Sequence, residues 1–425
     1  MALLEFQNVS KSYDNVTKAL SDITFSIEKG EFVSIIGPSG AGKSTLLRCI
    51  NRLVDASEGT IVFDGHDVRK AGKAEMRQMR AKIGMIFQHY NLVERLSVIE
   101  NVLHGCLGKK SAISGMAGHY TEEEKKKVYD FCEEYRIFLS KCKTERECVK
   151  EILKEAEAKG YRNLKEVRKS GEKLQAGDKV YVSIMGKTLA LFHIGEEPME
   201  KGMNILGAHI DSPRLDLKQN PLYETDGLAM LETHYYGGIK KYQWVAMPLA
   251  LHGVVAKKDG TTVEIALGED PSDPVIGISD LLPHLGRKQM EKRGNEVVEG
   301  EDLNILFGSI PLSGEEKEPV KKKILQLLKE KYNIEETDFI SAELEAVPAG
   351  NARNYGLDES MIMGYGQDDR VCAYPSYRAM FELDKPQYTC VCLLVDKEEI
   401  GSVGATGMRS RVFENTVAEV LSVCG

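Results

Sequence analysis

The chain lacks three features that each indicate a familiar class of protein. Its nine cysteines form no C-x-x-C pair, which argues against zinc fingers and dithiol redox sites and favours reduced thiols. It has no stripe of basic residues and a formal net charge of −9, so nonspecific binding to nucleic-acid phosphates is not expected. No apolar run is long enough to cross a membrane, and the N-terminus does not read as a signal peptide. We therefore expect a cytoplasmic chain without a nucleic-acid partner.

A phosphate-binding loop is present near the N-terminus. The segment GPSGAGKS fits G-x-x-x-x-G-K-[ST], with an apolar strand-like segment before it and a helix-like segment after it. In such a loop, glycines let backbone N–H groups approach phosphate oxygens, Lys43 reaches the outer phosphates and Ser44 can ligate magnesium. A merely Gly-rich turn is the alternative, and the agreement of all eight positions and both flanks argues against it. The residues expected to bind ATP with Mg²⁺ are Gly37, Pro38, Ser39, Gly40, Ala41, Gly42, Lys43, Ser44 and Thr45.

With this loop, residues 1–120 resemble the start of an ABC-transporter ATPase, in particular those of phosphonate importers. Tyr13, in KSYD, matches the aromatic residue on which the family stacks adenine, and Gln88, in IFQ, matches its sensor of magnesium and water. The match continues through NLVERLSVIENVL and then stops, because no LSGGQ-type signature, Walker B acidic pair or switch histidine follows. The resemblance implies a transporter permease as partner. Without the later motifs we expect weak ATP binding and no hydrolysis.

One later segment imitates a Walker B strand. CVCLLVD places Asp396 after an apolar run, but Lys397 stands where the catalytic glutamate belongs. The alternative is a buried strand that serves a different chemistry. We favour the buried strand because no ABC signature precedes the segment.

A different α/β segment is predicted to begin near residue 121. Thr121 with Glu124, and Thr144 with Glu147, fit the capping box that opens a helix. Apolar residues recur at helical spacing after each box, and the lysines that follow Glu124 fit a solvated helix face better than a binding patch. Further on, KVYVSIM and TLALFHI are predicted to form a hairpin around a Gly-Lys turn.

Three clusters of acidic or imidazole residues follow, each near the end of an apolar stretch. In NILGAHID, an H-x-D pair on a strand projects both side chains from one face, so His209 could bind a metal while Asp211 orients it. In GYGQDDR, a loop offers Asp368, whose two oxygens can bridge a pair of ions. In VDKEEIGS, Glu399 could ligate metal while Glu398 stays free to take a proton. Each pattern alone is common in ordinary strands, turns and surfaces, so the interpretation depends on all three together.

Together these clusters resemble the aspartyl aminopeptidase and aminopeptidase I family of dizinc metallopeptidases. The resemblance extends through GAHIDSPRLDLK, YGGIKKYQW, VPAGNAR and DKEEIGSVG, over roughly residues 125–425. It implies an α/β peptidase domain formed by residues 121–218 and 347–425, with an inserted β-rich domain, residues 219–346, that mediates assembly into a homo-oligomer. A strand-like stretch and an amphipathic helix opened by a proline agree with this insertion. His234 is a candidate for a histidine that some relatives extend into a neighbour's active site, with an ordinary histidine as the alternative.

The family mechanism implied by the resemblance is hydrolysis of the N-terminal residue of peptides by two zinc ions. Asp368 would bridge the ions, His209 would hold one and Glu399 the other. Glu398 would be the base that passes a proton to the leaving amine, and Asp211 would orient His209. The preferred N-terminal residue is left open, because acidic preference belongs to only part of the family.

Relatives supply a further Asp and a further His from sequence beyond the Glu-Glu strand, whereas no histidine follows His284 here. Losing a ligand costs more than the ~10–100-fold attributed to its hydrogen-bond partners, so we expect weak zinc binding and little turnover. Three interpretations stay open: an enzyme of the peptidase family, a nucleotide-binding module of a transporter, and an inactive hybrid of two gene fragments. Chelator-sensitive hydrolysis of aminoacyl anilides, and ATP binding with association to a permease, discriminate between the first two.

Overall fold

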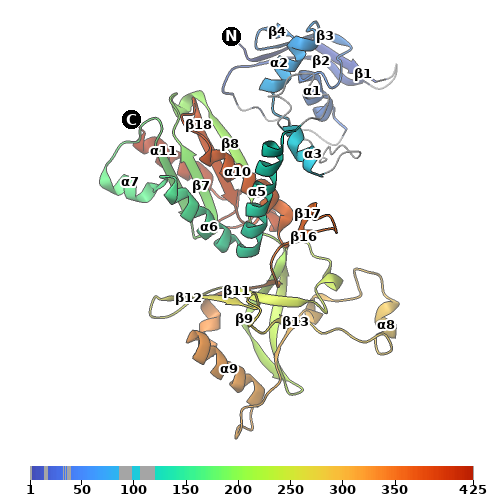
Figure 1. Ribbon diagram of the computed structural model, residues 1–425, viewed down its shortest axis with the longest axis vertical. Coiled ribbons are helices and arrows are strands. Elements are labelled where there is room, and N and C mark those ends of the chain that lie inside the picture. Colours follow the sequence, from blue (N-terminus) through green and yellow to red (C-terminus); the bar gives the residue numbers. More distant parts are fainter. Residues whose placement is uncertain are drawn as a thin grey trace. The chain divides into compact units, whose positions relative to one another are not determined.

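The computed structural model describes residues 2–13, 18–31, 33, 35, 40–85, 98–105 and 120–424. It divides into two compact units, one formed by Met1–Val128 with Pro198–Met203 and the other by Tyr129–Glu197 with Asn204–Gly425. Figure 1 labels the elements of each unit, and α5 and β8, which begin at residues of the first unit, are described below with the second. Among the described residues, no helix combines the length and the apolar character needed to span a bilayer.

The first unit contains a four-stranded sheet in the order β2-β1-β3-β4. Its elements are β1 Leu4–Ser12, β2 Lys18–Ile27, α1 Lys43–Ile50, β3 Glu58–Phe63, β4 His66–Asp67, α2 Lys73–Lys82 and α3 Val98–Leu103. Phe6 and Ile61 are buried under the helices, and Phe6 stacks on Phe25 at 4.7 Å between ring centroids. The helix expected after the phosphate-binding loop is confirmed as α1. The predicted strand before the loop lies largely outside the described residues.

The second unit contains a five-stranded sheet in the order β5-β6-β7-β18-β8. Its elements are α5 Glu122–Lys141, α6 Glu145–Ala158, β5 Arg162–Asn163, α7 Leu164–Ser170, β6 Lys179–Ile184, β7 Thr188–His193, β8 Met203–His209, α10 Gln367–Phe381, β18 Thr389–Val395 and α11 Val412–Val423. The predicted capping box of α6 is confirmed, because the Glu147 amide donates to the Thr144 hydroxyl at 3.3 Å and the Thr144 amide donates to the Glu147 carboxylate at 3.0 Å. The predicted hairpin is confirmed as β6 and β7.

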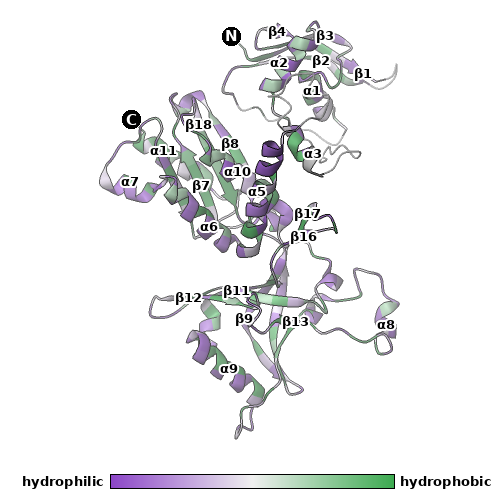
Figure 2. Cartoon of the chain, viewed as in Figure 1, coloured by the Kyte–Doolittle hydropathy of each residue, from purple (hydrophilic) through white to green (hydrophobic). Residues whose placement is uncertain are grey.

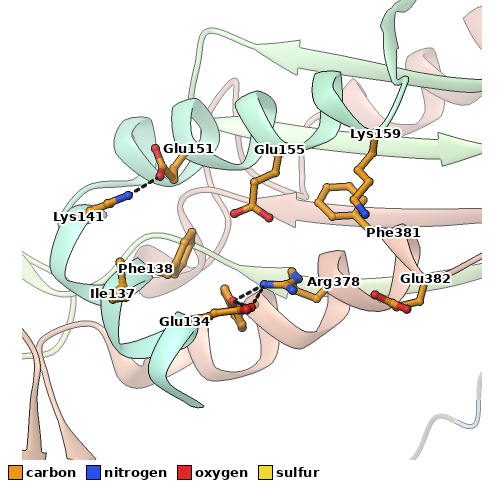
Figure 3. A pocket seen from close by; sticks show the side chains of 11 residues that line it. Glu134, Ile137, Phe138, Lys141, Glu151, Glu155, Lys159, Arg378, Phe381 and Glu382 are labelled. Carbon is orange, nitrogen blue, oxygen red and sulfur yellow. Dashed lines mark hydrogen bonds and ion pairs between the residues drawn. The ribbon is translucent and has the colours of Figure 1, made fainter. Parts of the chain in front are cut away.

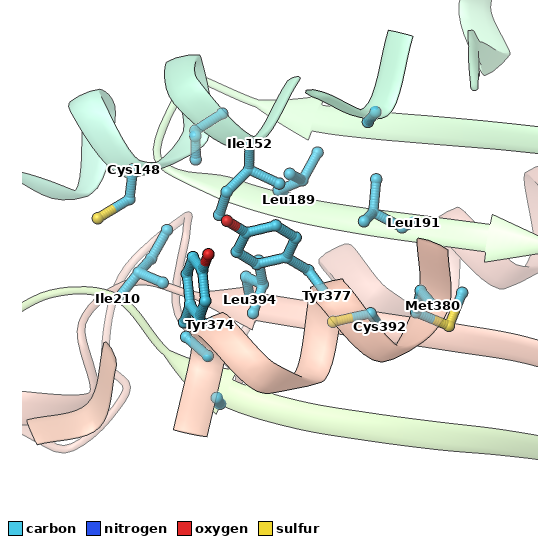
Figure 4. Packing of buried hydrophobic residues seen from close by; sticks show 14 of the residues in the cluster. Cys148, Ile152, Leu189, Leu191, Ile210, Tyr374, Tyr377, Met380, Cys392 and Leu394 are labelled. Carbon is cyan, nitrogen blue, oxygen red and sulfur yellow. The ribbon is translucent and has the colours of Figure 1, made fainter. Parts of the chain in front are cut away.

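The core of this sheet lies beneath α5, α6 and α10. Every residue of β7 and β18 is buried, which explains their continuous apolar sequences. Figure 4 shows Ile152 of α6 and Tyr377 of α10 meeting Leu191 and Cys392 of these strands. In Figure 2 the strands are hydrophobic, whereas the start of α5 is hydrophilic. β18 pairs with β7 in the second unit, which agrees with the buried strand that serves a different chemistry.

The same unit contains a seven-stranded sheet in the order β12-β11-β13-β14-β10-β9-β15, which is closed by a further pairing of β11 with β15. Its elements are β9 Arg214–Thr225, β10 Leu228–Tyr236, β11 Pro248–Ala256, β12 Thr262–Leu267, β13 Ile276–Gly277, α8 Arg287–Met290, β14 Ile305–Gly308, α9 Pro319–Tyr332 and β15 Ala342–Pro348. Leu231, Leu249 and Ile305 are completely buried inside it. β12 and α9 match the strand and the helix expected here. A short hairpin, β16 Arg353–Tyr355 with β17 Met361–Met363, follows.

Candidate functional site

The residues of interest in the second unit come from the ends of two neighbouring strands. β8 ends at His209 and β18 at Val395, and the Ile210 amide donates to the Val395 carbonyl at 2.9 Å. Because the strands end together, Asp211 lies close to the short helix Glu398–Ile400. The sequence predicted an H-x-D pair within a strand, but β8 stops at His209. Asp211 therefore lies in the turn after the strand, where its carboxylate can reach the imidazole.

The His209 imidazole faces two carboxylates with its Nε2 atom. Asp368, in the first turn of α10, has Oδ1 at 3.2 Å from Nε2, and Glu398 has Oε2 at 3.8 Å. The His209 side chain is only 9% exposed, whereas those of Asp368 and Glu398 are 87% and 55% exposed. The site thus combines a buried imidazole with two carboxylates that are exposed to solvent. Ser212 donates its hydroxyl to the Asp368 carbonyl at 3.1 Å, which fixes the loop that carries Asp368.

Asp211 connects the His209 ring to the backbone of Glu398 and Glu399. It is completely buried, and its carboxylate accepts from the backbone amides of Glu398 and Glu399, both at 3.2 Å. Its Oδ1 atom lies 3.4 Å from His209 Nδ1, and its carbonyl oxygen lies 3.0 Å from the same nitrogen. Two oxygens at Nδ1 favour the tautomer that is protonated there, which leaves the Nε2 lone pair for a metal ion.

The charges of the site are strongly coupled. Burial opposes protonation of His209, but its contact with Asp211 outweighs this and raises the pKa of His209 to about 9. Burial likewise opposes ionisation of Asp211, but hydrogen bonds from His209 and Tyr236 lower its pKa. The pKa of Glu399 is raised by burial and by the carboxylates of Asp211, Asp368 and Glu398, with His209 acting in the opposite direction. Loading such a site with a cation would release protons.

A glycine makes room for Glu399. Gly237 has φ +75°, and a Cβ built on it would lie 3.1 Å from the Glu399 Cβ and 3.4 Å from its Oε2. Its neighbour Gly238 has no heavy atom within 4 Å of a built Cβ. The first glycine of the YGG motif is therefore required by conformation and by space, whereas the second is not.

The donor set matches zinc in kind. His209, Asp368 and Glu399 offer one imidazole nitrogen and carboxylate oxygens, the ligands that zinc takes in hydrolytic sites. Across the described residues, however, the only three acidic or imidazole side chains whose ligand atoms all lie within 4.8 Å of one another are Glu145, Glu343 and Glu345. The predicted ligands therefore converge without forming a closed cage.

The Glu145, Glu343 and Glu345 group is a charge cluster. Lys187 Nζ lies 3.0 Å from a Glu145 oxygen and contacts Glu343. Arg214 lies 3.4 Å from Glu145 and 3.2 Å from Glu345. An ammonium and a guanidinium already occupy the places between these carboxylates, so we do not assign a metal to them.

In the first unit, the structure brings Tyr13 to the helix that follows the phosphate-binding loop. The Tyr13 hydroxyl lies 3.2 Å from the Thr45 hydroxyl, and Lys11 Nζ lies 5.2 Å from the centre of the ring. The Tyr13 ring is 58% exposed. Gly42 has φ +86°, and a Cβ there would lie 2.2 Å from the Ala19 carbonyl oxygen. Gly37, Pro38, Ser39 and Gln88 lie outside the described residues.

A surface groove elsewhere in the second unit contains none of the predicted site residues. It has a volume of about 320 Å³ and lies between α5, α6 and α10. Figure 3 shows its lining, with Arg378 paired to Glu134 at 2.5 Å and Lys141 paired to Glu151 at 3.1 Å. None of the predicted ligands or bases lines it, so it does not alter the assignment of the site.

Sequence reasoning missed Tyr236, whose hydroxyl donates to Asp211 Oδ2 at 2.7 Å. Tyr236 opens the YGG motif, which marked the family but suggested no role for the tyrosine. A tyrosine at the end of a half-buried strand is common, and the contact with Asp211 depends on tertiary structure. The YGG motif was therefore the only signal in the sequence that could have pointed to Tyr236.

Comparisons with known proteins match the two parts of the chain to different families. A family model described as aminopeptidase I zinc metalloprotease (M18) matches residues 138–424. A model described as ABC transporter matches residues 20–190. The overlap, residues 138–190, contains α6, β6 and the first half of β7, which the structure places in the second unit.

Individual relatives agree with this division. A probable M18 family aminopeptidase 1 of Clostridium acetobutylicum is 61% identical over 307 residues, which are 72% of this chain and 66% of that protein. The corresponding protein of Borreliella afzelii is 48% identical over 303 residues, 71% of this chain and 65% of that one. The chain thus spans about two thirds of the length of these relatives. The phosphonates import ATP-binding protein PhnC 2 of Oceanobacillus iheyensis is 56% identical over 137 residues, 32% of this chain and 54% of that protein.

Solved structures give the same result for the second unit. Aminopeptidase I from Clostridium acetobutylicum aligns with a TM-score of 0.66 and 60% identity over 72% of this chain and 67% of that one. An M18 aminopeptidase from Thermotoga maritima aligns with a TM-score of 0.66 and 44% identity over 72% and 65%. The dodecamer of S. cerevesiae mApe1 shares the fold with a TM-score of 0.56 and 20% identity, over 70% of this chain and 68% of that one.

Proposed function

Because the chain belongs to the family of aminopeptidase I zinc metalloproteases, we propose that it is a zinc-dependent aminopeptidase that removes N-terminal residues from peptides. The observation that carries the proposal is the direction of the His209 ring. Its Nδ1 side is held by Asp211, and its Nε2 atom lies 3.2 Å from Asp368 and 3.8 Å from Glu398. This orientation presents the Nε2 lone pair to the side of the ring where both carboxylates lie.

In this proposal His209, Asp368 and Glu399 would hold the zinc ions. When bound, the zinc pair supplies a Lewis acid that polarises the scissile carbonyl and activates water. Glu398, which is open to solvent, would take a proton from the attacking water and deliver it to the leaving amine nitrogen. Asp211 keeps Nδ1 protonated and the ring in place.

The test is a zinc titration of the 425-residue chain against a chromophoric chelator, run alongside hydrolysis of aminoacyl anilides. We expect His209→Ala to weaken zinc binding more than the ~10–100-fold attributed to a ligand's hydrogen-bond partners, and to abolish any hydrolysis that zinc supports. His284→Ala is the matched control, because His284 is exposed in another part of the unit. Equal zinc affinity in the wild type and in His209→Ala contradicts the proposal.

We further propose the domain limits that the resemblance implies, residues 1–120, 121–218 with 347–425, and 219–346, and assembly of the chain into a homo-oligomer through the inserted β-rich domain. The likeness in fold to the mApe1 dodecamer supports assembly. Analytical ultracentrifugation tests it. A strictly monomeric chain at micromolar concentration contradicts it.

Nucleotide binding by the first unit is a second candidate function, favoured by the contact between Tyr13 and Thr45. We propose that Tyr13 stacks on adenine, that residues 37–45 and Gln88 contact the phosphates and magnesium, and that a permease is the partner of this part. We expect ATP binding that Lys43→Ala abolishes, without steady release of phosphate. Phosphate release that is sensitive to Lys43→Ala contradicts the expectation that hydrolysis is lacking.

A further inference from the structure

The carboxylate of Asp211 is contacted by four donors, one of which belongs to a different sheet from the others. His209 and the amides of Glu398 and Glu399 come from the ends of β8 and β18. The fourth and shortest contact, 2.7 Å, is the hydroxyl of Tyr236. Tyr236 is the last residue of β10, which belongs to the closed seven-stranded sheet. The Asp211 carboxylate, which contacts the His209 imidazole, is therefore held by donors from both sheets of the unit.

The ring of Tyr236 is itself held in a fixed place. It is 4% exposed. The Arg214 guanidinium carbon lies 3.8 Å from the ring centroid, which is the close stacking expected of a cation on an aromatic face, and Lys397 Nζ lies 5.2 Å from the centroid. Arg214 and Tyr236 are directly opposite in the antiparallel pairing of β9 with β10. The backbone register alone thus aligns the guanidinium with the ring.

Arg214 cannot easily move away from this position. It is 2% exposed and contacts three carboxylates, those of Asp216 at 2.8 Å, Glu345 at 3.2 Å and Glu145 at 3.4 Å. Burial opposes ionisation of Tyr236, and the neighbouring Asp211 charge adds to this, so the pKa of Tyr236 is raised and the phenol remains a donor. The stacked Arg214 side chain therefore keeps the Tyr236 ring in place, with its hydroxyl directed at Asp211 Oδ2.

From this arrangement we propose that Tyr236 is a positioning residue of the metal centre, which acts through Asp211 on the His209 ring and on the turn that carries Glu398 and Glu399. The inference rests on the proposed zinc function for its consequence, but the contact itself does not. Without the phenol hydroxyl, Asp211 Oδ2 keeps only the Glu399 amide, so the carboxylate loses its shortest hydrogen bond and is held less firmly beside His209. A direct hydrogen-bond partner of a metal ligand, such as Asp211, typically changes metal affinity by about 10–100-fold, so a residue that acts through Asp211 should change it by less.

The experiment compares Tyr236→Phe with Tyr235→Phe. Tyr235 is the preceding residue of the same strand and is 44% exposed, so the control removes the same group from a different environment. Three quantities are measured on the full chain: zinc affinity by competition with a chelator, the visible absorption of the Co²⁺-loaded chain, and hydrogen–deuterium exchange of residues 395–402 without metal. We expect Tyr236→Phe to weaken zinc binding by at most about 10-fold, the lower end of the range for a direct partner, to shift the cobalt bands at saturation, and to speed the exchange of residues 395–402. Tyr235→Phe should change none of them.

Each outcome decides between the two proposals. Wild-type affinity, cobalt spectrum and exchange in Tyr236→Phe overturn the positioning role. If the wild-type chain binds neither zinc nor cobalt, the proposed zinc function fails, and the exchange measurement still decides whether Tyr236 holds the turn through Asp211. If circular dichroism shows that Tyr236→Phe is unfolded, Tyr236→His replaces it, because histidine keeps a ring with a donor. Exchange of residues 395–402 at the wild-type rate in Tyr236→His supports the positioning role. Exchange as fast as in the unfolded variant overturns it.

Discussion

At the scale of single residues, the site depends on space as much as on charge. Glu399 lies against the backbone of Gly237, where no side chain can be added without displacing it. Because this glycine has φ +75°, any other residue would also be strained there. The position of a proposed zinc ligand is thus set by a residue that takes no part in the chemistry.

Gly237→Ala tests this directly. We expect destabilisation by about 1–3 kcal/mol from the backbone conformation, together with weaker zinc binding because the new methyl group displaces Glu399. Gly238→Ala is the control, since nothing lies within 4 Å of its built Cβ. Denaturant titrations and zinc competition measure the two effects, and wild-type values for Gly237→Ala would show that the space is not needed.

At this scale, most of the residues that lie together at the site could be predicted from the sequence. His209, Asp368 and Glu398 are far apart in the chain, yet their motifs were sufficient to predict that they meet, and the structure brings their side chains within 4 Å of His209 Nε2. Their roles as ligands and base stay predictions. Tyr236 was not predicted, because its role depends on how β10 is placed beside Asp211, which no local pattern encodes.

At the scale of secondary-structure elements, a buried histidine joins α6 to the seven-stranded sheet. His252 of β11 is 3% exposed and lies between Glu147 of α6, at 2.8 Å, and Glu269, at 3.1 Å. Lys143 lies 3.6 Å from Glu269 and is the other charged group at this contact. Burial opposes protonation of His252, but the two carboxylates outweigh it and raise its pKa to about 9.

This contact predicts a specific dependence of stability on pH. Because the folded pKa of His252 is above the value of about 6.5 expected in the unfolded chain, its contribution is complete below pH ~6.5 and is lost as the pH rises through about 9. By linkage the contribution is about 3 kcal/mol, as an order of magnitude. We expect the melting temperature of the second unit to fall between pH 6.5 and 9.5, and to fall less in His252→Gln. Parallel pH profiles for the two proteins would contradict this.

Strand β8 has an exposed edge among the described strands of its sheet. It is last in the strand order, and Ile205 and Leu206 are 47% and 42% exposed. An exposed apolar edge strand is a template for pairing with another chain. We expect Ile205→Lys to reduce light scattering by concentrated protein, whereas Leu285→Lys, at an exposed loop position, should not. Equal scattering by both variants would remove β8 as the cause.

The elements that could be predicted from sequence are those with local signals. The capping box of α6, and the Gly-Lys turn between two strand-like segments for β6 and β7, each gave the correct element. The closure of the seven-stranded sheet by β11 with β15 could not be predicted, because it pairs residues that are far apart in the chain. β8 was placed correctly as a strand but ends at His209, before the aspartate that the pattern included.

At the scale of the whole molecule, the chain combines two units that match different families. The motifs were sufficient to recognise both families, and the comparisons confirm this recognition. The ABC transporter match runs on to residue 190, however, and so enters the sheet of the second unit. The chain's mixed α/β architecture is likewise confirmed.

Two units with separate sites should respond separately to their ligands. A ligand that binds only the folded state stabilises the unit that holds it. We expect calorimetry to show two unfolding transitions. Zinc should raise the temperature of one of them, and Mg-ATP should raise the temperature of the other. His209→Ala should abolish the response to zinc, and Lys43→Ala should abolish the response to Mg-ATP. A single transition that both ligands raise would contradict independent units.

The central claim is that His209, Asp368 and Glu399 form the zinc site of the second unit. Anomalous diffraction at the zinc edge, from crystals of the chain soaked in zinc, tests it most directly. A zinc site formed by these residues predicts density about 2.0–2.2 Å from His209 Nε2 and from carboxylate oxygens of Asp368 and Glu399. Zinc bound instead among Glu145, Glu343 and Glu345, or no zinc beside His209, would contradict it.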